Sequence, residues 1–258
     1  MNYGCCIRHL EELPQVKAAG YDFYEFAGHV VAEMDDATFD QLCALTRRLS
    51  FPCIGFNSYS SGIPAIVGDY FSIDATRAYA QILCERGHRL GIRGLGIGAP
   101  QARRLPPGFP RDQADEQCIA FLQTTCDIAR DYGISVLLEA VNDRVCQYLN
   151  NTQDVVRLIP RVQRDNLRMV VDFYHMRVMG EPLSAIVQAA PYLAHVHVST
   201  CAADLARGFP QMDEAQIYCD IFKALKAIGY DGTLSIEPNS FQPAAAAASL
   251  QMFQAIWG

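Results

Sequence analysis

The sequence predicts an α/β protein, a single (β/α)8 TIM barrel that takes up residues 1–258. The chain has 258 residues, short apolar runs alternate with longer helical patterns eight times, and no linker or change in composition divides it. About 250 residues is the typical size of such a barrel. Alternating strand and helix patterns predict parallel strands joined by crossover helices.

The eight predicted strands are short apolar runs, and several of them follow a glycine that closes the preceding helix. The runs cover residues 3–7, 22–26, 52–56, 92–97, 134–139, 168–172, 193–199 and 233–237. The glycines are Gly20, Gly91, Gly133 and Gly229. Glycine suits the left-handed position after a helix, where the chain turns back into the sheet. An open doubly wound sheet is the alternative, but it normally has a Gly-rich phosphate turn after its first strand, and CCIRHLEE contains no glycine.

Composition limits the partners and the compartment. Half of the chain is hydrophobic and the net charge is −7, which allows a large core and disfavours a nucleic-acid partner. The ten cysteines include no C-x-x-C pair, so we expect buried structural thiols in a reducing compartment. The first residues lack signal-peptide features and no apolar run reaches about 18 residues, so we expect a cytoplasmic protein without a membrane partner. The oligomeric state, monomer or homo-oligomer, stays open.

Four consecutive predicted strands end in a carboxylate or an imidazole. SVLLE ends in Glu139, RMVVD in Asp172 and LSIE in Glu237, while HVHVS contains His197. The active site of such a barrel lies at the carboxyl ends of its strands, so these side chains should meet. A carboxylate that follows apolar residues into a core is costly unless it is neutralised. The sequence therefore predicts one shared divalent cation; three carboxylates and one imidazole favour Mn²⁺ and also suit Mg²⁺, Co²⁺ or Zn²⁺.

Two further histidines accompany these strands. His175 forms an Asp-x-x-His pair with Asp172, and His195 precedes His197 by two residues and so lies on the same face of its strand. A lone histidine in an apolar strand is usually a satisfied core residue. His195 can therefore either line the pocket or pack below the metal layer.

These motifs resemble, in their order and spacing, the sugar phosphate isomerase/epimerase group of the xylose-isomerase-like TIM-barrel family. The segments that carry the resemblance are GYDFYEF, LLEAVN, the LNNT of residues 149–152, VVDFYHM, HVHVS and GYDGTLSIE. The resemblance covers nearly the whole chain. It implies that Glu139, Asp172, His197 and Glu237 bind one divalent metal and that His175 contacts a substrate oxygen. In the ketose 3-epimerases of that family the two glutamates also act as the acid–base pair.

Several other residues are predicted to contact the substrate. Arg103 and Arg104 follow the fourth predicted strand and Arg207 follows the seventh, in segments that look like parts of this group's pocket. The planar guanidinium can clamp a carboxylate, a phosphate or vicinal oxygens. The pattern favours Arg103 and Arg207 over Arg104. Tyr174, Asn142 and Asn57 are further pocket candidates, each of which can equally be an ordinary loop residue.

The sequence also departs from the family pattern. Val145 stands where the free-ketose 3-epimerases usually have a glutamate, and Thr200 stands where an acid is common. PNSFQP, after Glu237, contains no Gly-rich phosphate cradle, which favours free sugars or sugar acids over sugar phosphates.

We therefore expect a metal-dependent isomerase or epimerase. It would move a proton next to a carbonyl of a small sugar, sugar acid or related polyol, with Glu139 and Glu237 as base and acid. One alternative is a lyase or dehydratase that dehydrates an inosose or cleaves a 3-oxo-C-glycoside. An AP-endonuclease-like nuclease would need several histidines from the second to fourth strands, which here offer Glu25, Asn57 and, beyond the second strand, His29. A non-enzymatic sugar-binding barrel disagrees with the glutamate pair.

Overall fold

The computed structural model describes residues 1–200 and 206–257, and in them eight parallel strands close into a barrel in the order β1 to β8. The strands are β1 (Asn2–Ile7), β2 (Phe23–Ala27), β3 (Cys53–Asn57), β4 (Gly94–Ile97), β5 (Ser135–Glu139), β6 (Leu167–Asp172), β7 (Leu193–Val198) and β8 (Thr233–Ile236). Each strand overlaps its predicted run, so the predicted barrel is confirmed. Glu237, predicted as the last residue of its strand, lies one position beyond β8.

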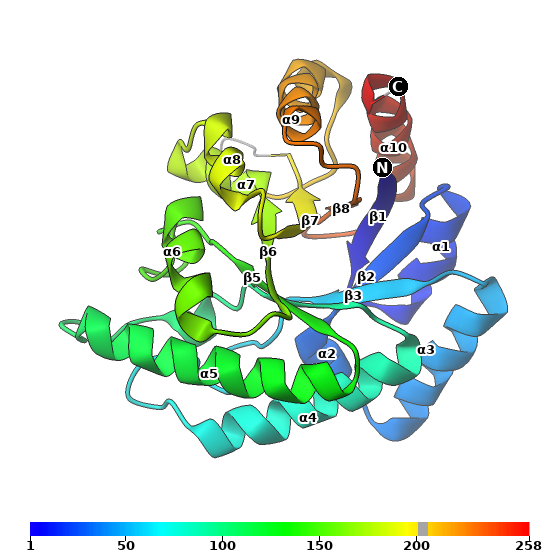
Figure 1. Cartoon of the computed structure of the whole chain (residues 1–258). Helices are drawn as coiled ribbons and strands as arrows, with labels where there is room; N and C mark the ends of the chain where they lie inside the picture. The colour runs from blue at the N-terminus through cyan, green and yellow to red at the C-terminus, as the bar shows by residue number, and fades with distance from the viewer. Residues whose placement is uncertain (201–205, 258) are drawn as a thin grey trace.

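Ten α-helices in the described part of the chain lie outside the barrel; α1 to α9 lie between successive strands and α10 follows β8 (Figure 1). They are α1 (Leu13–Ala18), α2 (Gly28–Glu33), α3 (Asp36–Leu49), α4 (Ile73–Leu90), α5 (Arg111–Asp131), α6 (Thr152–Val162), α7 (Phe173–Met179), α8 (Ile186–Ala189), α9 (Ala215–Ala227) and α10 (Pro243–Trp257). Helix α10 returns the chain to its start, where Tyr3 of β1 donates a hydrogen bond to the carbonyl of Phe253 at 3.4 Å. This contact places the last helix beside the first strand (Figure 1).

Local sequence signals fix where helices begin and end. Asp35, Ser72 and Asn151 each accept a hydrogen bond from a backbone N–H in the first turn of α3, α4 and α6. Such side chains satisfy amides that have no partner inside the helix. Helix α4 ends at Gly91 with φ 80°, and the other three glycines predicted to follow helices also have positive φ. The LNNT segment thus contains the cap of α6.

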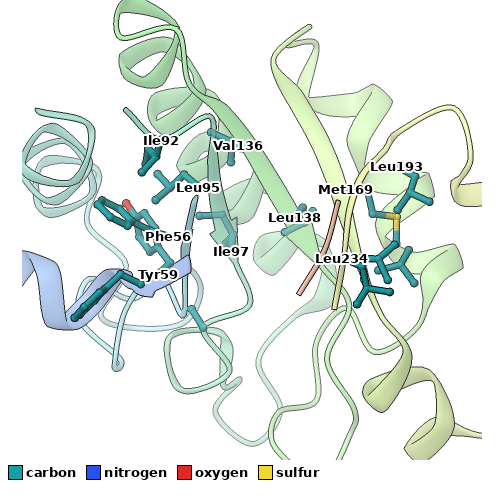
Figure 2. Packing of buried hydrophobic residues seen from close by; sticks show 14 of the residues in the cluster. Phe56, Tyr59, Ile92, Leu95, Ile97, Val136, Leu138, Met169, Leu193 and Leu234 are labelled. Carbon is teal, nitrogen blue, oxygen red and sulfur yellow. The ribbon is translucent and has the colours of Figure 1, made fainter. Parts of the chain in front are cut away.

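The core lies between the barrel and the helices. Figure 2 shows part of it, where Phe56 of β3 and Leu95 of β4 pack close to Tyr59, which follows β3. Nine described cysteines are free thiols, and eight of them are buried, as expected for structural cysteines; Cys201 lies outside the described residues. None of the helices in the described ranges has the length and apolar composition needed to span a bilayer.

Strand register aligns the ends of the strands that carry the candidate site. Asp172 at the end of β6 pairs with His197 on β7, and His197 pairs with Ser235 on β8. A shift in register between Met169 and Val170 brings these pairs into line. The carboxyl ends of β5 to β8 therefore open onto the same rim of the barrel.

Candidate metal centre and substrate cavity

Four side chains from neighbouring strands converge at this rim. Ligand atoms of Glu139, Asp172, His197 and Glu237 all lie within 4.8 Å of one another. Their side chains are 9%, 0%, 3% and 13% exposed, respectively. The structure thus brings together the four residues that the sequence predicted as metal ligands.

The cluster fits a cation because two of its buried donor atoms have no hydrogen-bond partner among the described residues. These atoms are Oε1 of Glu139 and Nδ1 of His197, and Nδ1 lies 3.4 Å from Oε2 of Glu237. Burial, together with the negative charges of Asp172 and Glu237, raises the pKa of Glu139 to about 8. A divalent cation would offset this repulsion, and three carboxylates with one imidazole are a donor set for Mn²⁺ or Mg²⁺.

Arg207 reaches the same carboxylates. Its Nη2 donates to Oδ2 of Asp172 and to Oε2 of Glu237, each at 2.6 Å, and its Nε donates to the carbonyl of Glu237 at 3.1 Å. Burial by itself would raise the pKa of Asp172, but Arg207, His175 and His197 lower it to about 2. The guanidinium also stacks on the ring of Tyr174, 4.5 Å from its centroid. Arg207 is therefore held in the cavity wall by three hydrogen bonds and one ring contact.

His175 is held with one ring nitrogen toward the site. The backbone N–H and the side-chain Nδ2 of Asn142 lie 3.1 and 2.7 Å from Nδ1 of His175. Both groups are donors, so Nδ1 accepts and the proton of the neutral ring is on Nε2. Burial lowers the pKa of His175 to about 3, which keeps the ring neutral. Its Nε2 lies 3.5 Å from Nη1 of Arg207, 3.8 Å from Oδ2 of Asp172 and 3.9 Å from Oε1 of Glu139, and its N–H can donate to a substrate oxygen.

Three residues predicted to contact substrate instead lie behind the cavity wall. Arg103, fully buried at the end of a 3-10 helix (Gln101–Arg103), donates from Nη1 to the carbonyl of Glu139 at 2.9 Å. Asn57, the last residue of β3, donates from Nδ2 to Oε1 of Glu237 at 2.9 Å. Asn142 holds His175 as described above. Each of the three therefore supports a residue of the site: Arg103 supports Glu139, Asn57 supports Glu237 and Asn142 supports His175.

The structure also locates Arg104 and His195, neither of which lies at the cluster. Arg104 is exposed, contacts the carbonyl of Val145 at 3.4 Å and does not line the cavity that opens above the cluster. His195 packs below the metal layer, which settles the open alternative, with its Nε2 2.7 Å from Oε1 of Glu25. It lines a second cavity of about 320 Å³ near the amino-terminal ends of the strands.

A cavity of about 430 Å³ opens above the cluster. Glu139, Glu237, His175, Tyr174 and Arg207 line it on the side of β5 to β8. Most of the opposite wall comes from residues that the sequence reasoning missed: Arg8, Ser58, Ser60, Ser61 and Gln101. The rule that found the cluster also applies to Arg8, which directly follows β1, and to Ser58, which directly follows β3.

Glycine makes room for one carboxylate. Gly98 directly follows β4, and a Cβ atom added to it would overlap Oε2 of Glu139. Val145, which replaces the glutamate common in free-ketose 3-epimerases, lines the cavity as an apolar residue. Both positions shape the space in which a substrate would lie against the cluster.

Several curated proteins are similar to this chain in sequence. The chain is 25% identical over 234 residues to a D-psicose 3-epimerase of Agrobacterium fabrum, which covers 88% of this chain and 78% of that protein. It is 33% identical over 132 residues to a ketose 3-epimerase of Arthrobacter globiformis, which covers 51% of this chain and 43% of that protein. Several curated relatives, including the second of these, align with the chain over less than half of their own length. These relatives are sugar isomerases and epimerases.

Solved structures share the fold over the full chain. A D-psicose 3-epimerase crystallised in the presence of D-fructose superposes with a TM-score of 0.83 at 19% identity and covers 100% of both chains. A 3-keto-D-glucoside 4-epimerase from E. coli gives a TM-score of 0.78 at 21% identity and covers 99% of both chains. A sequence profile of the xylose isomerase-like TIM barrel matches residues 13–256. The chain therefore belongs to the xylose isomerase-like TIM-barrel family.

Proposed function

We propose that this protein is a divalent-metal-dependent isomerase or epimerase that moves a proton next to the carbonyl of a small sugar, sugar acid or related polyol. The observation that carries the proposal is the convergence of Glu139, Asp172, His197 and Glu237 within 4.8 Å at the floor of a cavity. The sugar isomerases and epimerases among its relatives support the same reaction class.

The four clustered residues would hold one cation, for which Mn²⁺ is the first choice and Mg²⁺, Co²⁺ or Zn²⁺ are the alternatives. When bound, the cation supplies Lewis-acid polarisation of the substrate's carbonyl oxygen, which makes the neighbouring C–H more acidic. Side chains of this chain would transfer the proton and orient the substrate.

Glu139 and Glu237 are the proposed proton-transfer pair. Both line the cavity, and β5 and β8 are three strands apart around the barrel, so their carboxylates face the substrate from different directions. Oε1 of Glu139 has no hydrogen-bond partner in the described structure and can accept a proton. One carboxylate would remove the proton from carbon. The other would return it to the opposite face for epimerisation or to the neighbouring carbon for isomerisation.

We assign substrate orientation to the polar side chains that line the cavity above the cluster. Nε2–H of His175 and the guanidinium of Arg207 can donate to substrate oxygens from one side. Arg8 and the serines at positions 58, 60 and 61 face them across the cavity. Arg8 makes no ion pair with any described residue and can receive the carboxylate of a sugar acid. A volume of about 430 Å³ suits a small sugar, since ligand pockets commonly measure about 300–1,000 Å³.

The test is a product assay with metal-stripped and Mn²⁺-loaded protein. Free ketoses, sugar acids and 3-oxo-glycosides would be incubated with each form, and the products identified by NMR. We expect a sugar isomeric with the substrate, formed only by the loaded protein. A product that has lost water or released an aglycone would instead assign the chain to elimination chemistry. Equal turnover by both forms would overturn the metal requirement.

A further inference from the structure

Glu25 is a buried carboxylate that the proposed reaction does not use. It lies in the apolar strand β2, is 4% exposed and projects into the barrel interior. Its Oε1 lies 2.7 Å from Nε2 of His195 and 3.1 Å from Nε2 of His197. Both histidines belong to β7, so Glu25 joins strands from different parts of the closed sheet.

The contacts to Glu25 fix where His197 carries its proton. An ionised carboxylate can only accept hydrogen bonds, so Nε2 of each imidazole must be the donor. In a neutral His197 the proton on Nε2 leaves a lone pair on Nδ1. That nitrogen faces the candidate metal ligands and has no hydrogen-bond partner among the described residues. Glu25 therefore selects the form of His197 that can bind a cation through Nδ1.

The barrel contains features that keep Glu25 in this place. An isolated buried carboxylate is strongly unfavourable, so the two imidazole donors are needed to retain it. Gly55 pairs with Glu25 on the neighbouring strand, and a Cβ atom there would lie 3.3 Å from Oε2 of Glu25 and 3.1 Å from the carbonyl of Gly94. On the far side, Nδ1 of His195 lies 2.7 Å from the hydroxyl of Thr233. Gly55 on β3 therefore leaves space for the Glu25 carboxylate, and the imidazoles on β7 supply its hydrogen-bond donors.

We propose that Glu25 is a positioning residue that acts through His197: it holds Nε2–H and so presents Nδ1 to the metal. The inference rests on the proposed metal site. Carboxylates commonly orient a metal-binding histidine through its second nitrogen and raise its basicity. Cys6 also lies near, with Sγ 3.7 Å from Oε1 of Glu25 and 4.0 Å from Nε2 of His197. Because Oε1 already accepts from both histidines, these residues form a hydrogen-bonded support and we expect no second cation among them.

The first test is Glu25→Gln. The amide oxygen can take the place of Oε1, which contacts both imidazoles, but it carries no charge, so it holds the two Nε2–H donors much more weakly. We expect Mn²⁺ affinity, measured by calorimetry, to fall about 10- to 100-fold. Thr233→Val is the matched control, because it removes a hydrogen bond from the same network, and the hydroxyl of Thr233 contacts His195 but not His197. Its Mn²⁺ affinity should stay within about threefold of the wild type, a limit below the smallest effect expected of a supporting carboxylate.

The second test uses the unaltered protein, so it does not depend on the folding of a variant. Long-range ¹H–¹⁵N spectra of the Zn²⁺-loaded, histidine-labelled chain report which nitrogen of His197 carries the proton. We expect a proton on Nε2 and coordination through Nδ1; the reverse assignment would overturn the inference. A folded Glu25→Gln protein with wild-type Mn²⁺ affinity would also overturn it and leave the proposed function standing. Absence of metal binding by the wild type would remove the proposed function itself.

Discussion

Nη2 of Arg207 lies 2.6 Å from Oδ2 of Asp172, one of the four candidate metal ligands. The same nitrogen lies 2.6 Å from Oε2 of Glu237. A single guanidinium thus neutralises, in part, two carboxylates that a cation would also need. Arg207 and the cation therefore compete for these oxygens, and the arginine limits the repulsion among the acids when no metal is bound.

Replacing Arg207 by Ala should separate these two roles. We expect kcat/KM to fall at least about tenfold because substrate positioning is lost, while metal content after loading is unchanged. The metal-free variant should be less stable than the wild type, so added Mn²⁺ should raise its Tm by a larger increment. Arg177→Ala is the control, since Arg177 pairs with Glu214 away from the cluster. An unchanged kcat/KM on the true substrate would remove Arg207 from the substrate site.

The two glutamates can be tested with amide variants. Glu139→Gln and Glu237→Gln keep an oxygen able to bind metal but lose the carboxylate that accepts a proton. Each should fold and should lose at least about 10²-fold in kcat, the lower end of what a general base contributes. If the reaction is an epimerisation, one variant should still exchange the substrate proton with solvent without forming the other epimer. Full activity of metal-loaded Glu139→Gln would leave Glu139 as a ligand only.

Gly98→Ala tests whether the placement of Glu139 depends on the missing side chain. A methyl group at position 98 would overlap Oε2 of Glu139 and push the carboxylate out of the cluster. We expect weaker Mn²⁺ binding and lower kcat. The far-UV circular dichroism spectrum should stay native, because Gly98 lies just beyond β4 and not within it. Wild-type metal affinity would show that the loop adapts without moving the ligand.

Away from the site, the pair of Asp127 and Arg164 should make stability depend on pH. Nε and Nη2 of Arg164 donate to the two carboxylate oxygens at 2.6 and 2.8 Å, and these hydrogen bonds lower the pKa of Asp127. A lowered folded-state pKa contributes stability above the unfolded value of about 3.9, and this is lost as the pH falls through the folded-state value. The Asp127 side chain is 46% exposed, so solvent screening limits the contribution to about 1 kcal/mol or less.

Asp127→Asn should therefore lower Tm at pH 7 by at most about 4 °C and have little effect near pH 2. Thermal melts at the two pH values measure this difference. Asp165→Asn is the control, because Asp165 is 90% exposed and lies 3.5 Å from Arg130. Equal destabilisation by Asp127→Asn at both pH values would mean that the pair contributes through packing rather than charge.

The barrel and the cluster could be predicted because both depend on strand ends. Glu139 and Asp172 each follow an apolar run, and parallel strands bring their carboxyl ends to one rim, so sequence order alone places them together. The direction of a side chain that lies beyond the end of a strand could not be predicted in this way. Arg103 was expected to reach the substrate, but the short 3-10 helix turns it under the backbone of Glu139. Nothing in the composition of that loop encodes this turn.

Contacts across the barrel interior were also outside the reach of the sequence. The pairing of Glu25 with His195 and His197 joins residues 170 and 172 positions apart. Such contacts depend on strand tilt and stagger, which set the layer that each inward side chain occupies. The alternation within β7 showed that the two histidines share a face, but their depth in the barrel came only from the structure.

Solvent-deuterium incorporation tests the central claim most directly. Free ketoses and sugar acids would be incubated in D₂O with Mn²⁺-loaded and with metal-stripped protein, and the recovered sugars analysed by mass spectrometry and NMR. The account predicts deuterium on the carbon next to the carbonyl, in the product and in recovered substrate, with the loaded protein alone. A sugar product formed without any deuterium on that carbon, or equal exchange by the metal-stripped protein, would contradict metal-dependent proton transfer by Glu139 and Glu237.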